Sequence, residues 1–405
     1  MQQRSVYKVN LMKKQIDIKI VDWWDSVDEI NFKNESLIQL LQKHLGYKYD
    51  FKWSNNPKYL IYSVFGDSHL EYSKDCVRIC IAWENVAIDW NLADYGISTY
   101  LMDFGERCLS YPYYLLYLQD LKFALKKHLI YDKKEKFCSF MVSNGSADKI
   151  RDEFFEKLCE YKKVDSGGRW KNNIGGPIGD RYNDFPTSKI EWNKNYKFNL
   201  CFENSSQKGY VTEKIIQAFT AGCVPIYWGD ESLCDEKYAK FRPIFNPKAF
   251  INVHNFDSIE SAIKEIERID NDDSAFEAMR KEPIFRTECL EEFLGEKFAN
   301  GGGQKGNIND IWSAENIDST IESMTNHAEQ ILANFFDNIF TRGTKQIKYG
   351  QRLNAYFSQR QSERIALRRT IRVKNALWKI RHIAIAPLKW IRALWRKIAW
   401  RFLKS

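Results

Sequence analysis

The sequence lacks the features that mark disulfide-rich, zinc-stapled or membrane-spanning proteins. Its nine cysteines stand apart in apolar segments such as VRICIAW and KFNLCFEN and form no CxxC pair, which favours buried, reduced thiols. No run of about 18 apolar residues is present, so no segment is expected to cross a bilayer as a simple helix. The N-terminal stretch has no long apolar core, so we expect no signal peptide, and no repeat of fixed period occurs.

Apolar and aromatic residues, by contrast, are plentiful. The chain has 405 residues, of which 44% are hydrophobic and 15% aromatic. This length exceeds the usual size of one core and the composition excludes a disordered chain, so two packed domains are expected. The 13 Trp and 21 Tyr would suit a sugar-binding cleft, but packing in the cores is the favoured explanation of these numbers.

The charge is distributed unevenly along the chain. Residues 360–405 hold fourteen Lys or Arg and one acidic residue, Glu363, which makes a net charge of +13. Because the whole chain carries +8, the remaining residues together carry −5. The body of the protein is therefore mildly acidic, and the basic character belongs to a tail.

The order of the apolar segments predicts two α/β units in series. The first unit has expected strands at 15–24, 58–66 and 77–85 and an expected helix at 36–47. The second has expected strands at 137–143, 197–204, 224–229 and 249–254, and expected helices at 148–164, 212–222 and 259–269. This alternation favours an α/β fold with parallel sheets, that is, two Rossmann-like units.

The chain is expected to divide into four parts, because the charged stretch YDKKEK at 131–136 interrupts the α/β pattern. We expect an N-terminal α/β domain at 1–133 and a second α/β domain at 134–318. A helix at 319–345 should pack back on the body, and 346–405 should form a basic amphipathic tail.

Polar residues that follow the strands of the second unit are candidates for an anion site, because open α/β sheets bind ligands beyond the carboxyl ends of their strands. Thr212 is a plausible N-cap for the helix at 212–222, whose free N–H groups attract an anion. Lys214 and Arg151 would complete a cradle for a pyrophosphate, and Glu213 could accept hydrogen bonds from sugar hydroxyls. Asn204 stands at the end of the neighbouring strand.

Simpler explanations exist for each of these residues, and the residues taken alone favour them. The sequence Thr-Glu-Lys at a helix start satisfies capping and dipole preferences without any ligand. Arg151 could be an exposed helix charge paired with Asp148, three residues earlier on the same face.

The stretch YKFNLCFENSSQKGYVTEKIIQAFTAGCVPIYWG, residues 196–229, decides between these alternatives. It resembles the donor-binding signature of the bacterial α1,3-fucosyltransferase family, in which FxLxFENS is followed by a Tyr-[Val/Ile]-Thr-Glu-Lys element, an apolar helix and a Pro-Ile-Tyr-Trp-Gly strand. The resemblance covers roughly residues 15–300 and is strongest at 137–253. It implies the GT-B fold, in which two Rossmann-like domains face each other across a cleft, with the donor on the second domain and the acceptor on the first.

The resemblance assigns the donor-side residues one by one. It implies that Arg151 and Lys214 bind the phosphates of GDP-fucose and that Asn204 and Tyr210 belong to the nucleotide-phosphate pocket. Glu213 matches the glutamate that contacts the fucose ring, and we count it among the expected catalytic residues.

The acceptor side needs a general base, because the family inverts the anomeric centre and the attacking hydroxyl must lose its proton. Glu84 and Asn85 follow the strand at 77–85 and resemble the start of the family segment ENxxxDxxxxDY, whose Glu is the proposed base. We therefore expect Glu84 to be catalytic, with Asn85, Asp89 and Asp94 as further acceptor-side candidates. Without the resemblance, a surface carboxylate at a strand end would be the favoured explanation of Glu84.

This segment departs from the family pattern. Ala87-Ile88 and Ser98-Thr99 stand where relatives often carry a proline and a phenylalanine, and Ser110-Tyr111 stands where they often carry a basic residue. The departures concern the choice of acceptor and leave the donor signature intact.

A divalent metal is not expected. Asp270 and Asp272 form a DxD pattern, but it follows a helix and not a strand, and we interpret it as a solvated loop. Arg151, Lys214 and a helix N-terminus can neutralise the leaving GDP. GDP-fucose would then be the donor substrate, and no cofactor would be required.

The C-terminal tail predicts a membrane surface as a partner. In APLKWIRALWRKIAWRFLKS the apolar side chains lie on one helical stripe and basic side chains occupy much of the rest. A nucleic-acid patch or a partner-docking helix is the alternative, but a continuous apolar stripe favours the membrane, and no nucleic acid is expected. Related bacterial enzymes end similarly, which implies a cytoplasmic protein attached peripherally to the inner face of the membrane.

The resemblance implies inverting transfer of L-fucose from GDP-fucose to a GlcNAc hydroxyl of an N-acetyllactosamine-type glycan, as in lipopolysaccharide or surface-glycan fucosylation. The alternative is a catalytically degenerate, membrane-bound protein that binds a nucleotide sugar. The presence of Glu84, Glu213 and Lys214 argues against that alternative.

Overall fold

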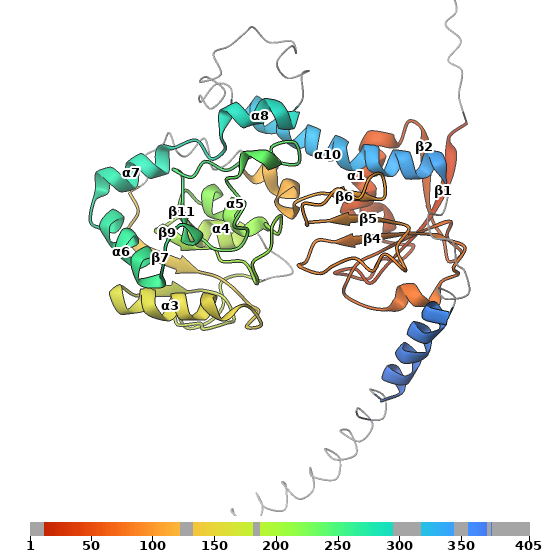
Figure 1. Cartoon of the computed structure of the whole chain (residues 1–405), viewed down its shortest axis with the longest axis horizontal. Coiled ribbons are helices and arrows are strands. Elements are labelled where there is room, and N and C mark those ends of the chain that lie inside the picture. The colour runs from red at the N-terminus through yellow and green to blue at the C-terminus, as the bar shows by residue number, and fades with distance from the viewer. Residues whose placement is uncertain are drawn as a thin grey trace, which may run out of the picture.

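The protein consists of two α/β units that lie side by side, with a helix running back from the second unit to the first (Figure 1). The computed structural model describes residues 12–121, 133–180, 187–294, 317–343 and 355–370, together with Lys374. All contacts given below are contacts among these residues.

The N-terminal unit is built on a six-stranded parallel sheet in the order β2-β1-β3-β4-β5-β6. The central strands β3 and β4 are buried along their whole length, as their continuous apolar sequences predict. The strands are β1 (Lys14–Val21), β2 (Tyr49–Trp53), β3 (Tyr59–Tyr62), β4 (Val77–Ala82), β5 (Tyr95–Ser98) and β6 (Cys108–Ser110). The helical elements are η1 (Phe32–Asn34), α1 (Ser36–Leu45), η2 (Ser68–Glu71) and η3 (Tyr113–Asp120).

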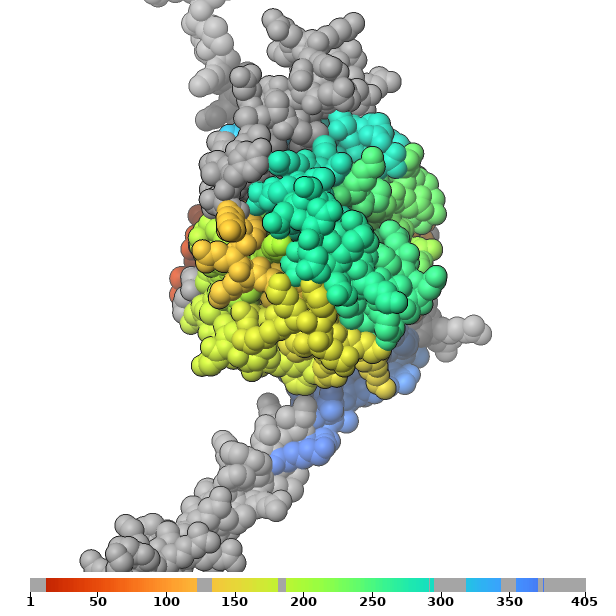
Figure 2. All heavy atoms as spheres, turned by 90° about the vertical axis from the view of Figure 1, so that its left-hand side faces the viewer, coloured from red at the N-terminus to blue at the C-terminus, as the bar shows by residue number. Residues whose placement is uncertain are grey.

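The C-terminal unit holds a five-stranded parallel sheet in the order β11-β10-β9-β7-β8. Its strands are β7 (Lys136–Phe140), β8 (Val164–Ser166), β9 (Tyr196–Leu200), β10 (Val224–Tyr227) and β11 (Ile251–Asn252). Its helices are α3 (Lys149–Tyr161), α4 (Thr187–Asn193), α5 (Glu213–Thr220), η4 (Glu236–Tyr238), η5 (Val253–Asn255), α6 (Ile259–Asp270), α7 (Asp273–Lys281) and α8 (Thr287–Leu294). Figure 2 faces this unit, and α3, α6 and α7 cover much of the surface that it shows.

The predicted α/β fold with two Rossmann-like sheets is confirmed, while three short strands were not expected from the sequence. β2 and β8 are the edge strands at one end of each sheet, and β6 has only 3 residues. The expected helix at 148–164 ends at Tyr161, and Val164 already begins β8. Strands this short are specified by pairing with a neighbouring strand, which a local pattern does not record.

Helix α10 (Ile317–Arg342) returns from the C-terminal unit and packs beside α1 on the N-terminal sheet (Figure 1). Phe340 makes edge contacts with Tyr49 and Tyr59, at 5.5 and 4.9 Å between ring centroids. The carboxylate of Asp337 accepts hydrogen bonds from the side chains of Lys48 and Tyr49. One face of the N-terminal sheet is therefore covered in part by a helix from far along the chain.

One apolar cluster extends from the N-terminal sheet into the C-terminal unit, whose own sheet packs around a second cluster. Tyr114 in η3 contacts Phe245 and Phe285 of the C-terminal unit, and its hydroxyl donates a hydrogen bond to the carbonyl of Pro243 (2.9 Å). Packing of this kind fixes the relative position of the two sheets more firmly than a polar interface would.

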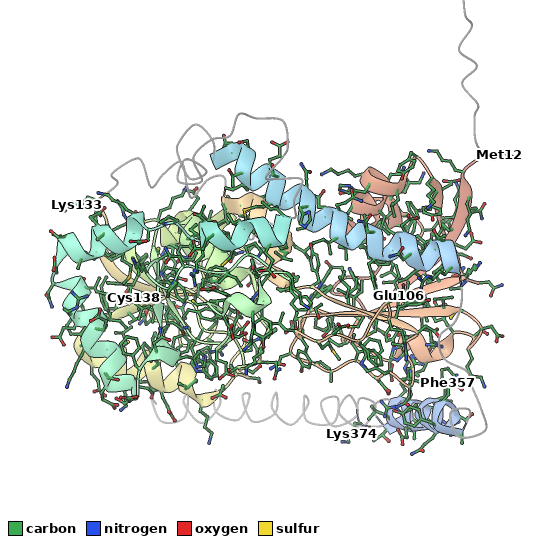
Figure 3. All side chains as sticks on the ribbon, turned by 45° about the horizontal axis from the view of Figure 1, so that its top comes forward. Met12, Glu106, Lys133, Cys138, Phe357 and Lys374 are labelled. Atoms are coloured by element: carbon green, nitrogen blue, oxygen red, sulfur yellow. The ribbon has the colours of Figure 1, made fainter. Side chains whose placement is uncertain are left out.

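A helical segment at 355–370 docks on the N-terminal unit, where Figure 3 labels Phe357. Phe357 is buried against Leu70 and Leu92, and the buried Arg364 pairs with Asp67 and Glu71. In the part of the chain that the structure describes, no helix is long and apolar enough to cross a membrane. The amphipathic stretch expected at 388–402 lies outside the described residues.

Candidate active site

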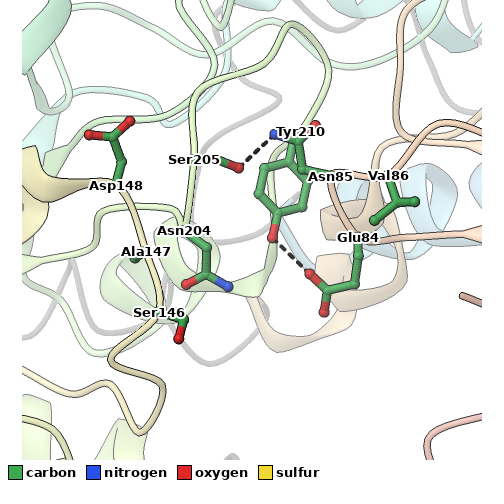
Figure 4. Close-up of a pocket in the computed structure, with 9 residues that line it drawn as sticks. All are labelled: Glu84, Asn85, Val86, Ser146, Ala147, Asp148, Asn204, Ser205 and Tyr210. Carbon is green, nitrogen blue, oxygen red and sulfur yellow. Dashed lines mark hydrogen bonds between the residues drawn. The ribbon is translucent and has the colours of Figure 1, made fainter. Parts of the chain in front are cut away.

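A cavity of about 490 Å³ opens between the two units (Figure 4). Three loops line it: one follows β4, one joins β7 to α3, and one follows β9. Because all strands of each sheet are parallel, these loops lie at the carboxyl edges of the two sheets, where α/β proteins bind ligands. The lining residues are Glu84, Asn85, Val86, Ser146, Ala147, Asp148, Asn204, Ser205 and Tyr210.

Glu84 meets the second unit directly in this cavity. The hydroxyl of Tyr210 donates a hydrogen bond to Oε2 of Glu84 across the domain boundary (3.0 Å; Figure 4). Burial is the main reason that the pKa of Tyr210 is raised, and the nearby carboxylates of Glu203 and Glu84 raise it further. Tyr210 therefore stays a hydrogen-bond donor, and it orients a half-buried carboxylate toward the cavity.

Asn85 ties the two units together beside Glu84. Its amide nitrogen donates to the hydroxyl of Ser205 (2.6 Å), and its amide oxygen accepts from the hydroxyl of Tyr100 (2.8 Å). Both ends of this amide are thus engaged, and the side chain holds the two lining loops at a fixed separation.

Arg151 is fully buried behind the cavity wall. Its guanidinium donates to the side-chain oxygen of Asn204 (3.0 Å) and to the carbonyl of Asn144 (2.5 Å), and burial lowers its pKa. The alternative pairing with Asp148 is wrong, because Asp148 caps α3 by accepting from the N–H of Ile150. Among the described residues no carboxylate forms an ion pair with this cation, so its charge reaches the cavity through Asn204.

The start of α5 is organised around the fully buried Glu203. Its carboxylate accepts hydrogen bonds from the N–H and hydroxyl of Thr212 and from the ammonium of Lys214, which lies 2.8 Å away. Thr212 occupies the N-cap position as expected, but the expected capping bond is absent there, because its hydroxyl contacts Glu203 and Lys214. The Thr212 side chain therefore does not satisfy the N–H groups in the first turn of α5.

Opposite charges favour the ionised forms of Lys214 and Glu213 in this cluster. Burial lowers the pKa of Lys214, but Glu203 and Glu213 more than offset this, and the net pKa is raised. Burial raises the pKa of Glu213, but Lys214 and Lys189 more than offset that effect, and its net pKa is lowered. The pKa of Glu203 is raised by burial in spite of Lys214.

Lys189 is a member of this cluster that sequence reasoning missed. It is 6% exposed on α4, which packs against α5, and burial lowers its pKa while Glu213 opposes that shift. The signal available in the sequence was weak, because Lys189 stands in the mostly polar segment TSKIEWN, and its burial is visible only in the structure. Two cations, Lys189 and Lys214, therefore lie near Glu203 and Glu213 at the start of α5.

The expected donor residues thus fall into two layers. Asn204 and Tyr210 line the cavity, whereas Arg151, Glu213 and Lys214 are not among its lining residues. Arg151 reaches the lining through its hydrogen bond to Asn204, and Lys214 lies close enough to Glu84 to feel its charge.

Two of the acceptor-side candidates are held by contacts away from the cavity lining. Asp94 is fully buried and accepts a hydrogen bond from the backbone N–H of Arg78 at the start of β4 (2.9 Å), so it lies at the edge of the sheet away from the cavity. Asp89 does not line the cavity, because its carboxylate accepts from the hydroxyl of Tyr356 in the docked segment 355–370 (2.6 Å). The spacing of a motif does not show which way the chain turns between its members.

The expectation of a solvated DxD loop holds for Asp272, which is exposed, and is wrong for Asp270. Asp270 is buried at the end of α6, where its carboxylate accepts hydrogen bonds from the side chains of Tyr161 and Lys162. Asp272 caps α7 through the N–H groups of Ser274 and Ala275. Both aspartates have structural partners, and in the described part of the chain no group of three or more His, Cys, Asp or Glu side chains could hold a metal ion.

Two parallel sheets whose carboxyl edges meet at one polar cavity are the arrangement of a GT-B glycosyltransferase, and the comparisons with known proteins agree. Residues 131–280 match glycosyltransferase family 10 (fucosyltransferase), C-terminal part, and residues 18–117 match the alpha-(1,3)-fucosyltransferase FucT N-terminal domain. These two matches together cover more than half of the sequence, and the chain belongs to this family of fucosyltransferases.

Individual members of the family are also similar in sequence to this chain. The chain is 32% identical to alpha-(1,3)-fucosyltransferase FucT of Helicobacter pylori over 301 residues, which are 64% of this chain and 58% of that protein. It is 29% identical to 4-galactosyl-N-acetylglucosaminide 3-alpha-L-fucosyltransferase 9 of Homo sapiens over 143 residues, which are 35% of this chain and 36% of that protein. The chain thus spans less than two thirds of the length of these relatives.

The fold is also similar to that of a solved structure. A crystal structure of alpha1,3-fucosyltransferase with GDP-fucose superposes with a TM-score of 0.54 and 25% identity, covering 78% of this chain and 94% of that one.

Proposed function

We propose that this protein is an inverting α1,3-fucosyltransferase, which moves L-fucose from GDP-fucose to a GlcNAc hydroxyl of an N-acetyllactosamine-type glycan. The observation that carries the proposal is the hydrogen bond between Tyr210 and Glu84 (3.0 Å). It brings a carboxylate of the first unit to the loop of the second unit that leads into Glu213 and Lys214. A family whose relatives are named for this reaction supports the same assignment.

On the donor side, the proposed role of the cations is to bind and polarise the diphosphate. Arg151, Lys214 and the first turn of α5 supply positive charge that is fixed before the donor arrives. Charge of this kind stabilises the GDP leaving group as the bond between fucose C1 and the phosphate oxygen breaks. Glu213 would accept hydrogen bonds from the fucose hydroxyls.

On the acceptor side, Glu84 is the proposed general base. Tyr210 occupies Oε2 of this carboxylate, which leaves Oε1 to take the proton. In one displacement the acceptor oxygen bonds to fucose C1, its proton passes to Glu84, and GDP departs on the opposite face, so the anomeric configuration inverts. Tyr210 would hold the base in place during this step.

The composition of the tail supports a proposed place of action. Ten basic residues between 371 and 405, beyond the docked segment, and the apolar stripe support peripheral attachment to an anionic membrane. We place the enzyme in the cytoplasm, on the inner face of the membrane, where it would fucosylate lipopolysaccharide or another surface glycan before export.

The direct test is incubation of the full chain with GDP-fucose and a panel of acceptors, N-acetyllactosamine among them, followed by linkage analysis of the product. We expect GDP release that depends on the acceptor and a fucose attached to O3 of GlcNAc. GDP-mannose serves as the control donor. Binding of GDP-fucose without consumption would refute the enzyme and favour a nucleotide-sugar-binding protein, and an α1,4 product would refute the regiochemistry alone.

A further inference from the structure

Aromatic side chains gather at the carboxyl edge of the N-terminal sheet, beside Glu84. Trp24 follows β1, Phe65 follows β3, Trp83 follows β4 and Tyr113 follows β6. Because these strands are parallel, the four residues emerge at the same edge of the sheet. Their rings are in contact, with centroid distances of 4.9 Å between Trp24 and Phe65, 5.7 Å between Trp24 and Trp83, and 5.4 Å between Trp83 and Tyr113.

The exposure of these rings is graded from the core outward. Trp83 is only 6% exposed, whereas Trp24 is 40% and Phe65 is 46% exposed. A single exposed ring on a protein surface needs no explanation, but two exposed rings in contact, supported by a buried one, form a continuous apolar surface. The buried ring, Trp83, directly precedes Glu84, which lines the cavity. The indole N–H of Trp83 is buried and has no hydrogen-bond partner among the described residues.

The two loops that carry the exposed rings are tied together. The carboxylate of Asp22 accepts hydrogen bonds from the N–H groups of Ser68 and His69 and contacts Nδ1 of His69, at 2.8 to 2.9 Å. Asp22 adopts φ 55°, a conformation that costs a non-glycine residue about 1 kcal/mol or more, and these contacts offset that cost. Trp24 and Phe65 are therefore held in position before any ligand binds.

This aromatic surface adjoins Glu84, which directly follows Trp83 in the chain. The pKa of Tyr113 is raised to about 12, chiefly by burial, with the charges of Glu213 and Glu84 also contributing. Both carboxylates that we assign to the reaction thus lie near the ring that links Trp83 to Trp24; Trp24 and Tyr113 lie parallel, 6.4 Å apart.

We propose that Trp24 and Phe65, supported by Trp83, form a binding platform for a pyranose ring of the acceptor glycan. A hexose presents C–H groups on its face and hydroxyls around its edge, so an aromatic surface can bury the face while the edge remains free for hydrogen bonds. A sugar seated there would bring a neighbouring hydroxyl toward Glu84. The platform rests on the proposed function, because it gives that reaction its acceptor subsite.

The test compares the kinetics of single variants of the full chain with N-acetyllactosamine as acceptor. Trp24→Ala and Phe65→Ala should each raise the KM for the acceptor about fivefold to tenfold, while the KM for GDP-fucose and kcat stay within about twofold. Trp24→Phe keeps a ring and should have a smaller effect. The matched control is Tyr47→Ala, which removes an aromatic ring that is 78% exposed between α1 and β2, at the opposite edge of the sheet.

A second measurement separates the platform from the reaction. Saturation-transfer NMR with N-acetyllactosamine alone should show contact with the wild-type protein and a weaker signal for Trp24→Ala, whether or not fucose is transferred. Failure of the wild type to transfer fucose would refute the proposed function, and the NMR titration would still decide the platform. An unchanged acceptor KM and NMR signal in both alanine variants would overturn the platform.

Exposed aromatic rings can also insert into a membrane. The same variants distinguish a sugar-binding platform from a membrane contact. If Trp24→Ala lowered binding to vesicles of anionic phospholipid and left the acceptor KM unchanged, the surface would be a membrane contact and the proposal would be wrong. We expect vesicle binding to be the same for this variant and for the wild type.

Discussion

The two units place different kinds of side chain around the cavity. The C-terminal side is charged and closed: Glu203 and Arg151 are fully buried, and the side chain of Lys214 is 14% exposed. The N-terminal unit contributes the half-buried Glu84, and next to it in the chain Trp83 supports the exposed aromatic rings of Trp24 and Phe65. A buried charge without a partner costs much free energy, so such charges need fixed partners. Apolar surface that is exposed to water before a ligand binds costs less.

The two units should therefore recognise their ligands differently. A diphosphate is small and highly charged, so a rigid cluster of cations can be prepared for it, with Glu203 holding Lys214 in place. A glycan is larger and neutral, and a flat apolar surface binds it weakly and tolerates variation in what it accepts. The donor side should therefore be intolerant of substitution, and the acceptor side should be tolerant except at Glu84.

The largest effect is expected from Glu84→Gln, which isolates the acceptor side. The amide cannot take the acceptor proton, so kcat should fall by about a thousandfold. The affinity for GDP, measured by calorimetry, should stay within about twofold, since Glu84 makes no hydrogen bond to the donor cations. Transfer at a normal rate would remove Glu84 from the mechanism.

Lys214→Met isolates the donor side and should weaken GDP binding by about tenfold to a hundredfold, because a charge-assisted contact to phosphate is lost. It should also lower the melting temperature, because Glu203 is left buried without its cation. The double variant Glu203→Gln with Lys214→Met should recover the stability and not the GDP affinity. Lys208→Met, which removes an exposed cation paired with Glu231, is the control and should change neither.

Gly209→Ala tests the contact between the two sides. Gly209 has φ +90°, and a Cβ there would lie 2.0 Å from the carbonyl oxygen of Thr99 in the first unit. The substitution should lower the free energy of unfolding by about 2 to 4 kcal/mol in urea titrations. Gly175→Ala has nearly the same φ, +92°, in open space and should cost only about 1 kcal/mol. Equal losses would show that the backbone conformation, and not the domain contact, explains the effect.

The smallest effect is expected at Asp120, in the 3-10 helix η3 that joins the two sides. Burial raises its pKa from 3.8 to about 6. The folded state thus holds the proton more tightly than the unfolded chain, so stability from this group is complete below about pH 4 and is lost as the pH rises to about 6. Asp120→Asn should remove this loss, about 1 kcal/mol, from melting curves between these pH values and leave GDP affinity unchanged.

Much of the donor side could be predicted because its residues are neighbours in sequence. Glu203, Thr212 and Lys214 span one loop and one helix start, so a contiguous signature describes them. Lys189 was not predicted as a site residue, because its electrostatic interaction with Glu213 depends on how α4 packs against α5.

The acceptor side was harder to predict, because its arrangement depends on how segments that are distant in sequence pack together. Asp89 and Asp94 share a short motif with Glu84, yet the chain turns away after Asn85 and carries both to structural contacts. The aromatic residues of the platform come from four loops, and only the strand order of the sheet brings them together.

The sequence by itself determined the two parallel α/β units and the charged loop before α5, since apolar periodicity and a contiguous motif are local properties. Only the tertiary structure decided that Glu84 meets Tyr210, 126 residues away, and that the Thr212 hydroxyl contacts Glu203 instead of capping α5. Those contacts depend on how two sheets pack against one another, and no local pattern encodes that packing.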